Sequence, residues 1–304
     1  MQDAFRRVRR SVASLFSRDR DNEEEVKGNS VPLKLETRIG QGTFATVWRC
    51  SYGGETRAAK VILTSSLKPS DQNLLKNEIR IWSSLSHPNI LPLLHIEHAN
   101  NMCILVCELL DETLRQRHMR MVRLGTKPRI LTILNGLEQV ASGMLYIHSR
   151  RFLHRDLKSD NILLTMDNET YKIGDFGLAR TAEGDDKTAE TGSYRHMAPE
   201  VIRHEPYASP CDVYSFAMLF YEMLTLTTPF VHYTPVDAAL AVATRAERPP
   251  VPPCPDDVSN LLRSCWDQDA SRRPSFPEIC KRIEVLKLKK SSFGSLQMGR
   301  LQIS

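Results

Sequence analysis

The sequence predicts an α+β fold in which a small β-rich part precedes a larger, mainly helical part. Apolar and β-branched residues alternate over residues 31–59, and glycines stand at turn positions within that stretch. A single helical pattern follows at residues 70–86. Helical periodicity then dominates from Ile130 onward, most clearly at 130–149 and 209–225.

Composition limits the class of protein. The chain has 304 residues, 41% of them hydrophobic, so a two-lobed enzyme domain would nearly fill it. The formal net charge of +5 argues against a nucleic-acid-binding protein. The seven cysteines include no CxxC pair, which favours reduced thiols and a cytoplasmic location over a zinc site or disulfide framework. No uninterrupted apolar run approaches the roughly 18 residues that span a bilayer.

The first 30 residues form a basic, amphipathic N-terminal tail with two interpretations. Five arginines surround apolar residues at three- and four-residue steps between positions 5 and 16, which would place one apolar stripe on a helix. Such a helix would make weak contact with a membrane surface or direct the chain to an organelle. Alternatively, the tail is disordered alone or docks on its own domain.

A glycine-rich segment lies between two predicted strands. Glycines in a hairpin allow the backbone to approach phosphate groups closely. A dinucleotide-binding glycine motif would instead open a helix, whereas strand residues follow here, and alone the segment could equally be a tight turn. Its residues are Ile39, Gly40, Gln41, Gly42, Thr43, Phe44, Ala45, Thr46 and Val47.

The next chemical signal is Lys60, at the end of the apolar strand sequence Ala58-Ala59-Lys60-Val61. A buried ammonium group needs a carboxylate partner, and Glu78 on the following predicted helix is the candidate. Such a pair can hold phosphate oxygens.

The strongest signal is the ordered set of three motifs in the helical part. His154-Arg155-Asp156-Leu157-Lys158-Ser159-Asp160-Asn161 has the catalytic-loop pattern H-R-D-L-x-x-x-N. Asp175-Phe176-Gly177 and then Ala198-Pro199-Glu200 follow in order. Each motif alone could arise by chance, but the three together with these gaps could not.

With these motifs the chain resembles a eukaryotic protein kinase catalytic domain from about residue 33 to 286. The resemblance implies the bilobal protein-kinase fold, with a small antiparallel sheet and one key helix in the N-lobe. The N-lobe would cover 31–107, the hinge 108–111 and the C-lobe 112–286, followed by a polar tail at 287–304 with the last helical turn near Leu286.

The resemblance also implies a role for each motif residue in ATP-dependent phosphoryl transfer. Asp156 would orient the substrate hydroxyl as base, and Lys158 would contact the γ-phosphate. Asn161 and Asp175 would bind Mg²⁺. Lys60 would hold the α- and β-phosphates and pair with Glu78, while the glycine-rich segment covers the phosphates. The adenine ring and hinge contacts would involve Val47, Ala58, Cys107 (the gatekeeper), Glu108, Leu110 and Leu163.

Other matches to the family are architectural. Asp212 resembles the aspartate that anchors the catalytic loop, and Glu200 with Arg273 resembles a bracing ion pair. The residues His154, Phe176, Trp82 and Leu93 fall at the positions of a hydrophobic spine. One departure is Ala45 in place of the third glycine, which we expect to alter nucleotide affinity without loss of activity unless φ there is positive.

Two positions favour Ser and Thr as acceptors. Lys158 follows the Ser/Thr kinase pattern, and Ser193 stands where those kinases place a hydroxyl that touches Asp156 and Lys158. The segments 190–200 and 265–276 resemble the tyrosine kinase-like group, including Raf-like and plant integrin-linked-like kinases. His196 replaces the usual aromatic residue of that group, so dual specificity stays open.

Control is expected in the segment from Asp175 to Glu200. Its threonines Thr181, Thr188 and Thr191 are candidate phosphosites, and a phosphate there could pair with Arg155; alternatively, they only solvate the loop. A pseudokinase is a rival hypothesis, but Lys60, Asp156, Asn161 and Asp175 are all present. A small-molecule kinase is disfavoured by the Ala198-Pro199-Glu200 platform.

Overall fold

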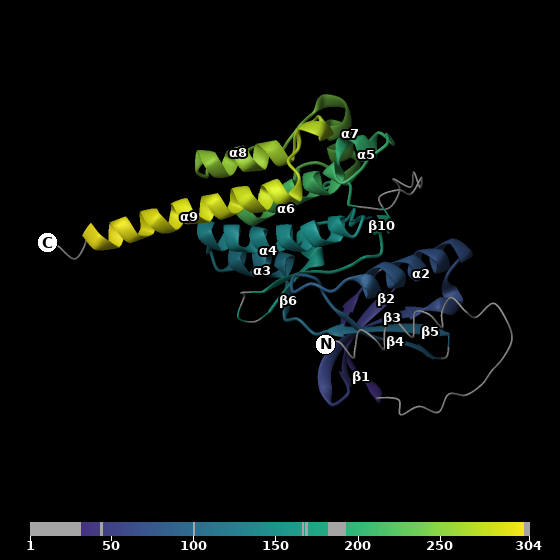
Figure 1. Ribbon diagram of the computed structural model, residues 1–304. Coiled ribbons are helices and arrows are strands. Elements are labelled where there is room, and N and C mark those ends of the chain that lie inside the picture. The colour runs from purple at the N-terminus through teal and green to yellow at the C-terminus, as the bar shows by residue number, and fades with distance from the viewer. Residues whose placement is uncertain are drawn as a thin grey trace. The chain divides into compact units, whose positions relative to one another are not determined.

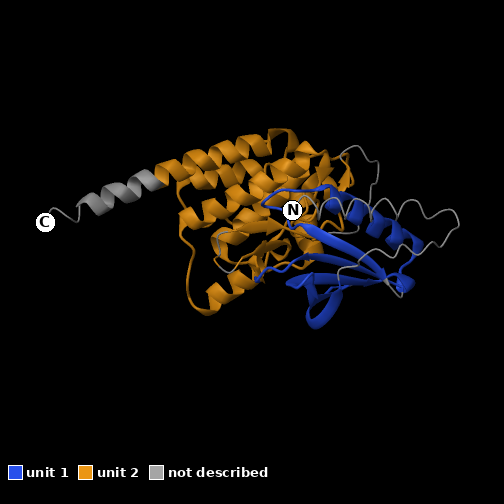
Figure 2. Ribbon diagram, turned by 60° about the horizontal axis from the view of Figure 1, so that its bottom comes forward, with its two compact units in different colours: residues 1–111 blue, residues 112–304 orange. Residues whose placement is uncertain are grey.

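A computed structural model describes residues 32–42, 45–99, 101–165, 167, 170–181 and 193–300. At residues 99 and 291–300 it describes the backbone only. The chain divides into two compact units, residues 1–111 and 112–304 (Figure 2). The predicted hinge, 108–111, lies at the end of the first unit.

The first unit contains one antiparallel sheet of five strands in the order β1-β2-β3-β5-β4 (Figure 1). The strands are β1 (Leu33–Gln41), β2 (Ala45–Tyr52), β3 (Glu55–Leu63), β4 (Leu93–Ala99) and β5 (Met102–Glu108). Gly53 and Gly54 join β2 to β3 with φ values of 63° and 80°, the left-handed pair that a tight two-residue hairpin requires. The predicted small antiparallel sheet is confirmed.

In the described part of this unit one α-helix accompanies the sheet, α2 (Pro69–Ser84), after a short 3-10 turn η1 (Thr64–Ser66). The predicted helix at 70–86 is therefore confirmed, shifted by one or two residues at each end. Its buried face carries Glu78, Ile79, Ile81, Trp82 and Ser83, whereas Leu74 and Leu75 are only half-buried. The Trp82 indole nitrogen donates to the Leu91 carbonyl oxygen at 2.6 Å, which satisfies its polar atom inside the core.

The second unit is mainly helical. Its α-helices are α3 (Leu114–Arg123), α4 (Ile130–Ser149), α5 (Pro199–Ile202), α6 (Pro210–Thr225), α7 (Pro235–Arg245), α8 (Asp256–Cys265) and α9 (Phe276–Arg300). Short strands form a sheet β6-β8-β9 and a pair β10-β7. Their bounds are β6 (Glu112–Thr113), β7 (Phe152–Leu153), β8 (Ile162–Leu164), β9 (Tyr171–Ile173) and β10 (Arg180–Thr181), with 3-10 turns η2 (Ser159–Asn161) and η3 (Ala270–Arg272).

The core of this unit is built on α4 and α6. Thirteen of the sixteen residues of α6 are buried, so this helix is enclosed on all sides rather than amphipathic. By length and composition alone α4 could cross a membrane, although polar residues such as Asn135 and Glu138 interrupt its apolar sequence. Half of its most apolar window is buried, and α4 packs against α6 and α9 (Figure 1), which explains its composition as that of a core helix.

The last helix is longer than predicted. We expected its final turn near Leu286, but α9 continues beyond that residue. Lys287 forms an ion pair with Glu138 of α4, and the Lys290 ammonium lies 3.3 Å from the Asp257 carboxylate of α8. Lysine is a good helix former, and these two lysines hold the extension against α4 and α8. The polarity of this segment alone had led us to expect a tail.

Candidate active site

The glycine-rich segment forms the hairpin between β1 and β2. Gly40 lies opposite Val47, Gln41 lies opposite Thr46, and the Gly42 amide donates to the Ala45 carbonyl oxygen at 2.8 Å. Ile39 belongs to β1 and is 50% exposed. Thr43 and Phe44, also predicted to contact ATP, lie outside the described residues.

The fold itself does not require glycine at positions 40 and 42. A Cβ atom added at Gly40 would lie 3.4 Å from the Val47 Cβ, and one at Gly42 would lie 3.6 Å from the Ala45 carbonyl oxygen, both ordinary contacts. Neither glycine has a positive φ. A ligand approaching the backbone closely is therefore a better reason for these glycines. Ala45 also lacks a positive φ, so its methyl group adds no backbone strain.

Lys60 and Glu78 form the ion pair that the sequence predicted. The Lys60 Nζ donates to the Glu78 Oε1 at 2.6 Å, with side chains 26% and 8% exposed. β3 supplies the lysine and the buried face of α2 supplies the glutamate. Because a carboxylate this buried needs a cation, the pair fixes α2 against the sheet and holds an ammonium group at a defined place.

The predicted adenine-contact residues of the first unit lie on three adjacent strands. Val47 of β2 pairs with Lys60 of β3, and Ala58 of β3 pairs with Cys107 of β5. Burial raises the pKa of the Cys107 thiol to about 12, so this side chain is a neutral, apolar surface. Glu108 ends β5, and Leu110 follows it, both half-buried. Leu163, the remaining member, belongs to β8 of the second unit.

The catalytic-loop motif folds so that three of its polar side chains converge. The Asp156 Oδ2 accepts hydrogen bonds from the Lys158 Nζ at 2.6 Å and from the Asn161 Nδ2 at 2.9 Å. The Asn161 Nδ2 also donates to the Asp156 carbonyl oxygen at 2.8 Å. The Lys158 Nζ donates further to the Ser193 Oγ at 2.7 Å. The contact of Ser193 with Lys158 is therefore as the sequence predicted.

One atom in this group has no hydrogen-bond partner. The Asp156 Oδ1 is buried and accepts no hydrogen bond from any part of the chain that the structure describes. A buried carboxylate oxygen without a donor carries a desolvation cost of about 1–3 kcal/mol or more. Such a cost is expected where a substrate group supplies the missing donor.

Asp212 anchors the backbone of the catalytic loop. Its Oδ2 accepts from the His154 amide at 2.9 Å and lies 2.8 Å from the His148 Nε2, and its Oδ1 accepts from the Arg155 amide at 2.8 Å. Burial raises the pKa of Asp212, but these hydrogen bonds and the nearby imidazoles outweigh it and leave the pKa below its ordinary value. Arg155 has a φ of 68°, and the anchored amides hold this strained conformation immediately before Asp156.

Asn161 and Asp175 supply oxygen atoms suited to a hard cation. Both amide hydrogen bonds of Asn161 use its Nδ2, which leaves the Oδ1 for another partner. The Gly174 amide donates to the Asn161 carbonyl oxygen at 2.9 Å, so the residue before Asp175 is tied to Asn161. Asp175 is exposed and has a φ of 61°. Two oxygen ligands fit Mg²⁺, which takes its remaining ligands from phosphate and water.

An ion pair between Glu200 and Arg273 holds the end of the segment from Asp175 to Glu200 in place. The Arg273 guanidinium donates two parallel hydrogen bonds to the Glu200 carboxylate, at 2.7 and 2.9 Å, and both residues are buried. His154 and Phe176, predicted as spine residues, form an edge-to-face pair with ring centroids 5.4 Å apart. Thr181 lies exposed in β10, whereas Thr188 and Thr191 lie outside the described residues.

The sequence did not predict that Glu222 of α6 contacts both the catalytic loop and His196. The Glu222 Oε2 accepts from the Ser159 amide at 3.0 Å and lies 3.4 Å from the His196 Nε2. Burial raises the pKa of Glu222, but His196 and Ser159 outweigh it and leave the pKa below its ordinary value. The available signal was the lone carboxylate of Glu222 inside the apolar sequence 213–224 of α6, because such a group must have a buried partner.

Known proteins resemble most of the chain. Residues 33–283 match the protein kinase domain family. Among curated proteins, the serine/threonine-protein kinase STY17 of Arabidopsis thaliana is 32% identical over 88% of this chain and 46% of its own length. The serine/threonine/tyrosine-protein kinase HT1 of Arabidopsis thaliana is 33% identical over 86% of this chain and 68% of its own.

Human mitogen-activated protein kinase kinase kinase 11 is 33% identical over 88% of this chain, which spans 33% of that protein. This chain thus spans between a third and two-thirds of the length of these relatives. Similarity to these kinases agrees with the predicted tyrosine kinase-like group. From the match over residues 33–283 and the motifs placed above, the chain belongs to the protein kinase domain family.

Proposed function

We propose that this chain transfers the γ-phosphoryl group of ATP to Ser and Thr hydroxyls of protein substrates. The observation that carries the proposal is the state of the Asp156 carboxylate. Its Oδ2 is held by Lys158 and Asn161, while its buried Oδ1 has no donor among the described residues. A substrate hydroxyl that donates to the Oδ1 would satisfy that oxygen and be oriented for attack.

Lys158 would act beside this base. Its ammonium group has three donors, of which Asp156 and Ser193 use two. The third can donate to an oxygen of the transferred phosphoryl group, where negative charge spreads during transfer. As the hydroxyl oxygen forms its bond to phosphorus, the bond to the ADP oxygen breaks and Asp156 takes the hydroxyl proton.

The family implies ATP as the phosphoryl donor and, typically, Mg²⁺ as its companion ion. Asn161 and Asp175 are the residues that would hold the ion, which neutralises phosphate charge when bound. Lys60, held by Glu78, would bind the α- and β-phosphates, and the β1–β2 hairpin would cover them. Val47, Ala58, Cys107, Glu108, Leu110 and Leu163 would contact the adenine ring.

The acceptor class is proposed as Ser and Thr because Lys158 contacts Ser193. Dual specificity is the alternative, since His196 replaces an aromatic residue and the name of one relative, HT1, includes tyrosine. Phosphoamino-acid analysis of a labelled basic protein would decide between them. Label on tyrosine would overturn the Ser/Thr assignment.

The test of the activity compares Asp156→Asn with Asp160→Asn in the same loop. Both changes remove one negative charge, but the Asp160 side chain is 50% exposed and lies 3.6 Å from the Arg115 Nε. We expect phosphate transfer from labelled ATP with Mg²⁺ to fall by at least about 100-fold in Asp156→Asn, since general base catalysis contributes about 10²–10⁴-fold. Asp160→Asn should retain most of the activity.

Equal activity in the two variants would refute the role of Asp156. If neither the wild type nor the variants transfer phosphate although ATP binds, the pseudokinase hypothesis replaces the proposal. An enzyme that awaits phosphorylation of Thr181, Thr188 or Thr191 would be distinguished by activity after treatment with an upstream kinase.

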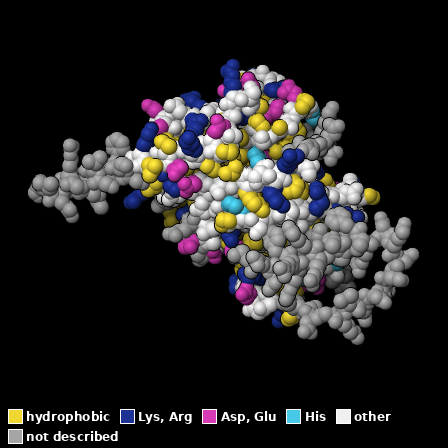
Figure 3. Space-filling view, viewed as in Figure 1, with side chains coloured by type: hydrophobic (Ala, Val, Ile, Leu, Met, Phe, Trp, Pro, Cys, Tyr) yellow, Lys and Arg dark blue, Asp and Glu magenta, His cyan; other side chains and the backbone are white. Residues whose placement is uncertain are grey.

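We propose protein substrates as partners and a cytoplasmic location. Within the described residues all seven cysteines are free thiols and five of them are buried, which supports a reducing compartment. We also propose that nucleic acid is not a partner, on the ground of the formal net charge of only +5; on the face drawn in Figure 3, Lys and Arg side chains are interspersed with Asp and Glu. The proposed membrane contact of residues 5–16 lies outside the described residues, and deletion of residues 1–30 would test it by a change in location.

A further inference from the structure

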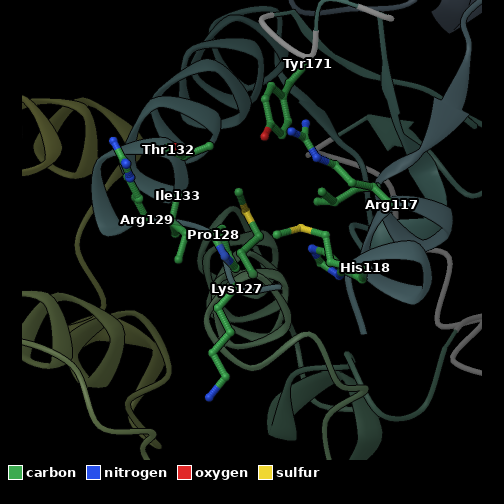
Figure 4. A pocket seen from close by; sticks show the side chains of 11 residues that line it. Arg117, His118, Lys127, Pro128, Arg129, Thr132, Ile133 and Tyr171 are labelled. Atoms are coloured by element: carbon green, nitrogen blue, oxygen red, sulfur yellow. The ribbon is translucent and has the colours of Figure 1, made fainter. Parts of the chain in front are cut away.

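The second unit contains a cavity of about 400 Å³, and none of its described lining residues belongs to the catalytic loop (Figure 4). It is lined by residues of α3, the α3–α4 connection, α4, β9 and α6. Ligand pockets for small organic molecules have volumes of about 300–1,000 Å³, so this cavity is large enough for one.

Part of the cavity wall is apolar. Leu114 and Ile133 are buried core residues, and two methionines, Met121 and Met223, add flexible side chains that adapt to a ligand. Gly136 of α4 leaves the space that the side chains of this wall occupy, because a Cβ atom there would lie 2.8 Å from both the Met223 Cε and the Tyr171 ring. An organic molecule could therefore bury an apolar body in the cavity.

The charged side chains among the described lining residues are all positive. None of its eleven lining residues is acidic, while Arg117, Lys127 and Arg129 are cationic. Figure 4 shows Arg117 and Tyr171 pointing toward each other, and Lys127 extending away. His118 adds no charge at neutral pH, because burial lowers its pKa to about 4.

Arg117 differs from Arg115 and Arg120 of the same helix in having a buried nitrogen without a hydrogen-bond partner among the described residues. Its Nη1 is buried and donates no hydrogen bond to any residue the structure describes. Arg120 forms a hydrogen bond with Glu112 at 2.5 Å, and the Arg115 Nε lies 3.6 Å from the Asp160 Oδ1. A buried guanidinium nitrogen without an acceptor is costly, and a bound anion would remove that cost.

Glu222, a buried carboxylate of α6, does not replace that anion. Glu222 lies close enough to influence His118, but its Oε2 accepts from the Ser159 amide and contacts His196. Among the residues that the structure describes, an unsatisfied cationic donor thus lies beside an apolar hollow whose lining contains no acidic residue.

We propose that this cavity binds a small organic molecule that carries one carboxylate and an apolar body. The carboxylate pairs with the Arg117 guanidinium, and the body packs between the methionines and Ile133. This site is separate from the residues proposed for phosphoryl transfer, so its test does not depend on kinase activity.

The probe is decanoate, titrated calorimetrically into the full chain below its micelle-forming concentration. Decanol keeps the apolar body without the charge, and acetate keeps the charge without the body. We expect decanoate to bind at least about tenfold more tightly than either, because charged hydrogen bonds and apolar burial both contribute.

Two variants locate the binding in the cavity. Arg117→Gln removes the charge and should weaken decanoate binding at least about tenfold, whereas Arg123→Gln removes an exposed charge from the same helix and should not. Thr132→Trp, at an exposed lining position of α4, should block binding by filling the space. A native melting transition for each variant excludes unfolding as the cause.

Several results would overturn the proposal. Equal affinity for decanoate and decanol would show a hollow without selectivity for an anion. Undiminished binding in Arg117→Gln, or no binding of decanoate to the wild type, would also refute it. If an acidic peptide binds at this site and decanoate does not, the occupant is a protein segment and the small-molecule assignment is wrong.

Discussion

The ion pair between Arg273 and Glu200 allows a quantitative test of the fold. The Arg273 side chain is 0% exposed and that of Glu200 is 7% exposed. Besides its two hydrogen bonds to Glu200, the guanidinium donates to the carbonyl oxygens of Asp267 and Pro210, each at 2.9 Å. It also lies over the Tyr214 ring, 5.2 Å from the centroid. Every part of this group is therefore engaged.

Arg273→Met replaces the guanidinium-bearing side chain by an unbranched apolar one of similar length. The Glu200 carboxylate then stays buried without a counter-ion. Breaking a buried pair in this way costs about 3–5 kcal/mol. We expect the free energy of unfolding to fall by about 4 kcal/mol, a large share of the roughly 5–15 kcal/mol of a typical domain. The neighbouring Arg272→Met is the control, since Arg272 is 74% exposed and its 3.5 Å pair with Asp269 should contribute less than about 1 kcal/mol.

The assay is urea unfolding at pH 7, followed by tryptophan fluorescence. Trp266 precedes Asp267, whose carbonyl oxygen accepts from Arg273, and therefore reports on this region. In the double variant Glu200→Gln/Arg273→Met the buried charge is gone, so we expect about 1–2 kcal/mol of the loss to be recovered. Equal stability of Arg273→Met and Arg272→Met, or no recovery in the double variant, would refute the reasoning.

Three further predictions concern the second unit. Asp212→Asn should reduce phosphate transfer and lower the free energy of unfolding by about 2–3 kcal/mol, measured in urea, because an amide cannot accept from both loop amides; unchanged values would contradict the anchoring role. His118 has a folded pKa lowered to about 4 from 6.5, so its neutral form is favoured by folding. The wild type should therefore lose stability as pH falls from 6.5 toward 4, by up to roughly 1.4 kcal/mol per pH unit, and His118→Asn should show a shallower loss in urea titrations at each pH. Gly136→Ala should lower stability by about 1 kcal/mol, since crowding against the Tyr171 ring costs about 1–3 kcal/mol and helix propensity returns about 1; a melting temperature above that of the wild type would contradict this.

Much of the fold could be predicted because periodicity is a local property. The helix predicted at 130–149 is α4, and the one predicted at 209–225 is α6 with its start moved by one residue. The antiparallel sheet followed from alternation and from glycines at turns. The end of α9 could not be predicted, because the ion pairs that hold Lys287 and Lys290 join residues distant in the chain.

The candidate site divides in the same way. The sequence by itself predicted which side chains would carry the chemistry, since the loop from His154 to Asn161 and the turn at Asp175 are compact motifs. It also paired Lys60 with Glu78 across eighteen positions, through charge complementarity.

Only the tertiary structure decided which atoms meet. It left the Oδ1 of Asp156 without a donor among the described residues, held Arg155 in a left-handed conformation, and joined Glu222 to Ser159 across 63 positions. It also placed the Nη1 of Arg117 beside an apolar hollow, with no hydrogen-bond partner in the described part of the chain. The physical reason is that hydrogen bonds and desolvation depend on the distances between elements, and only tertiary packing sets those distances. Residue type and local periodicity, in contrast, are properties of the sequence itself.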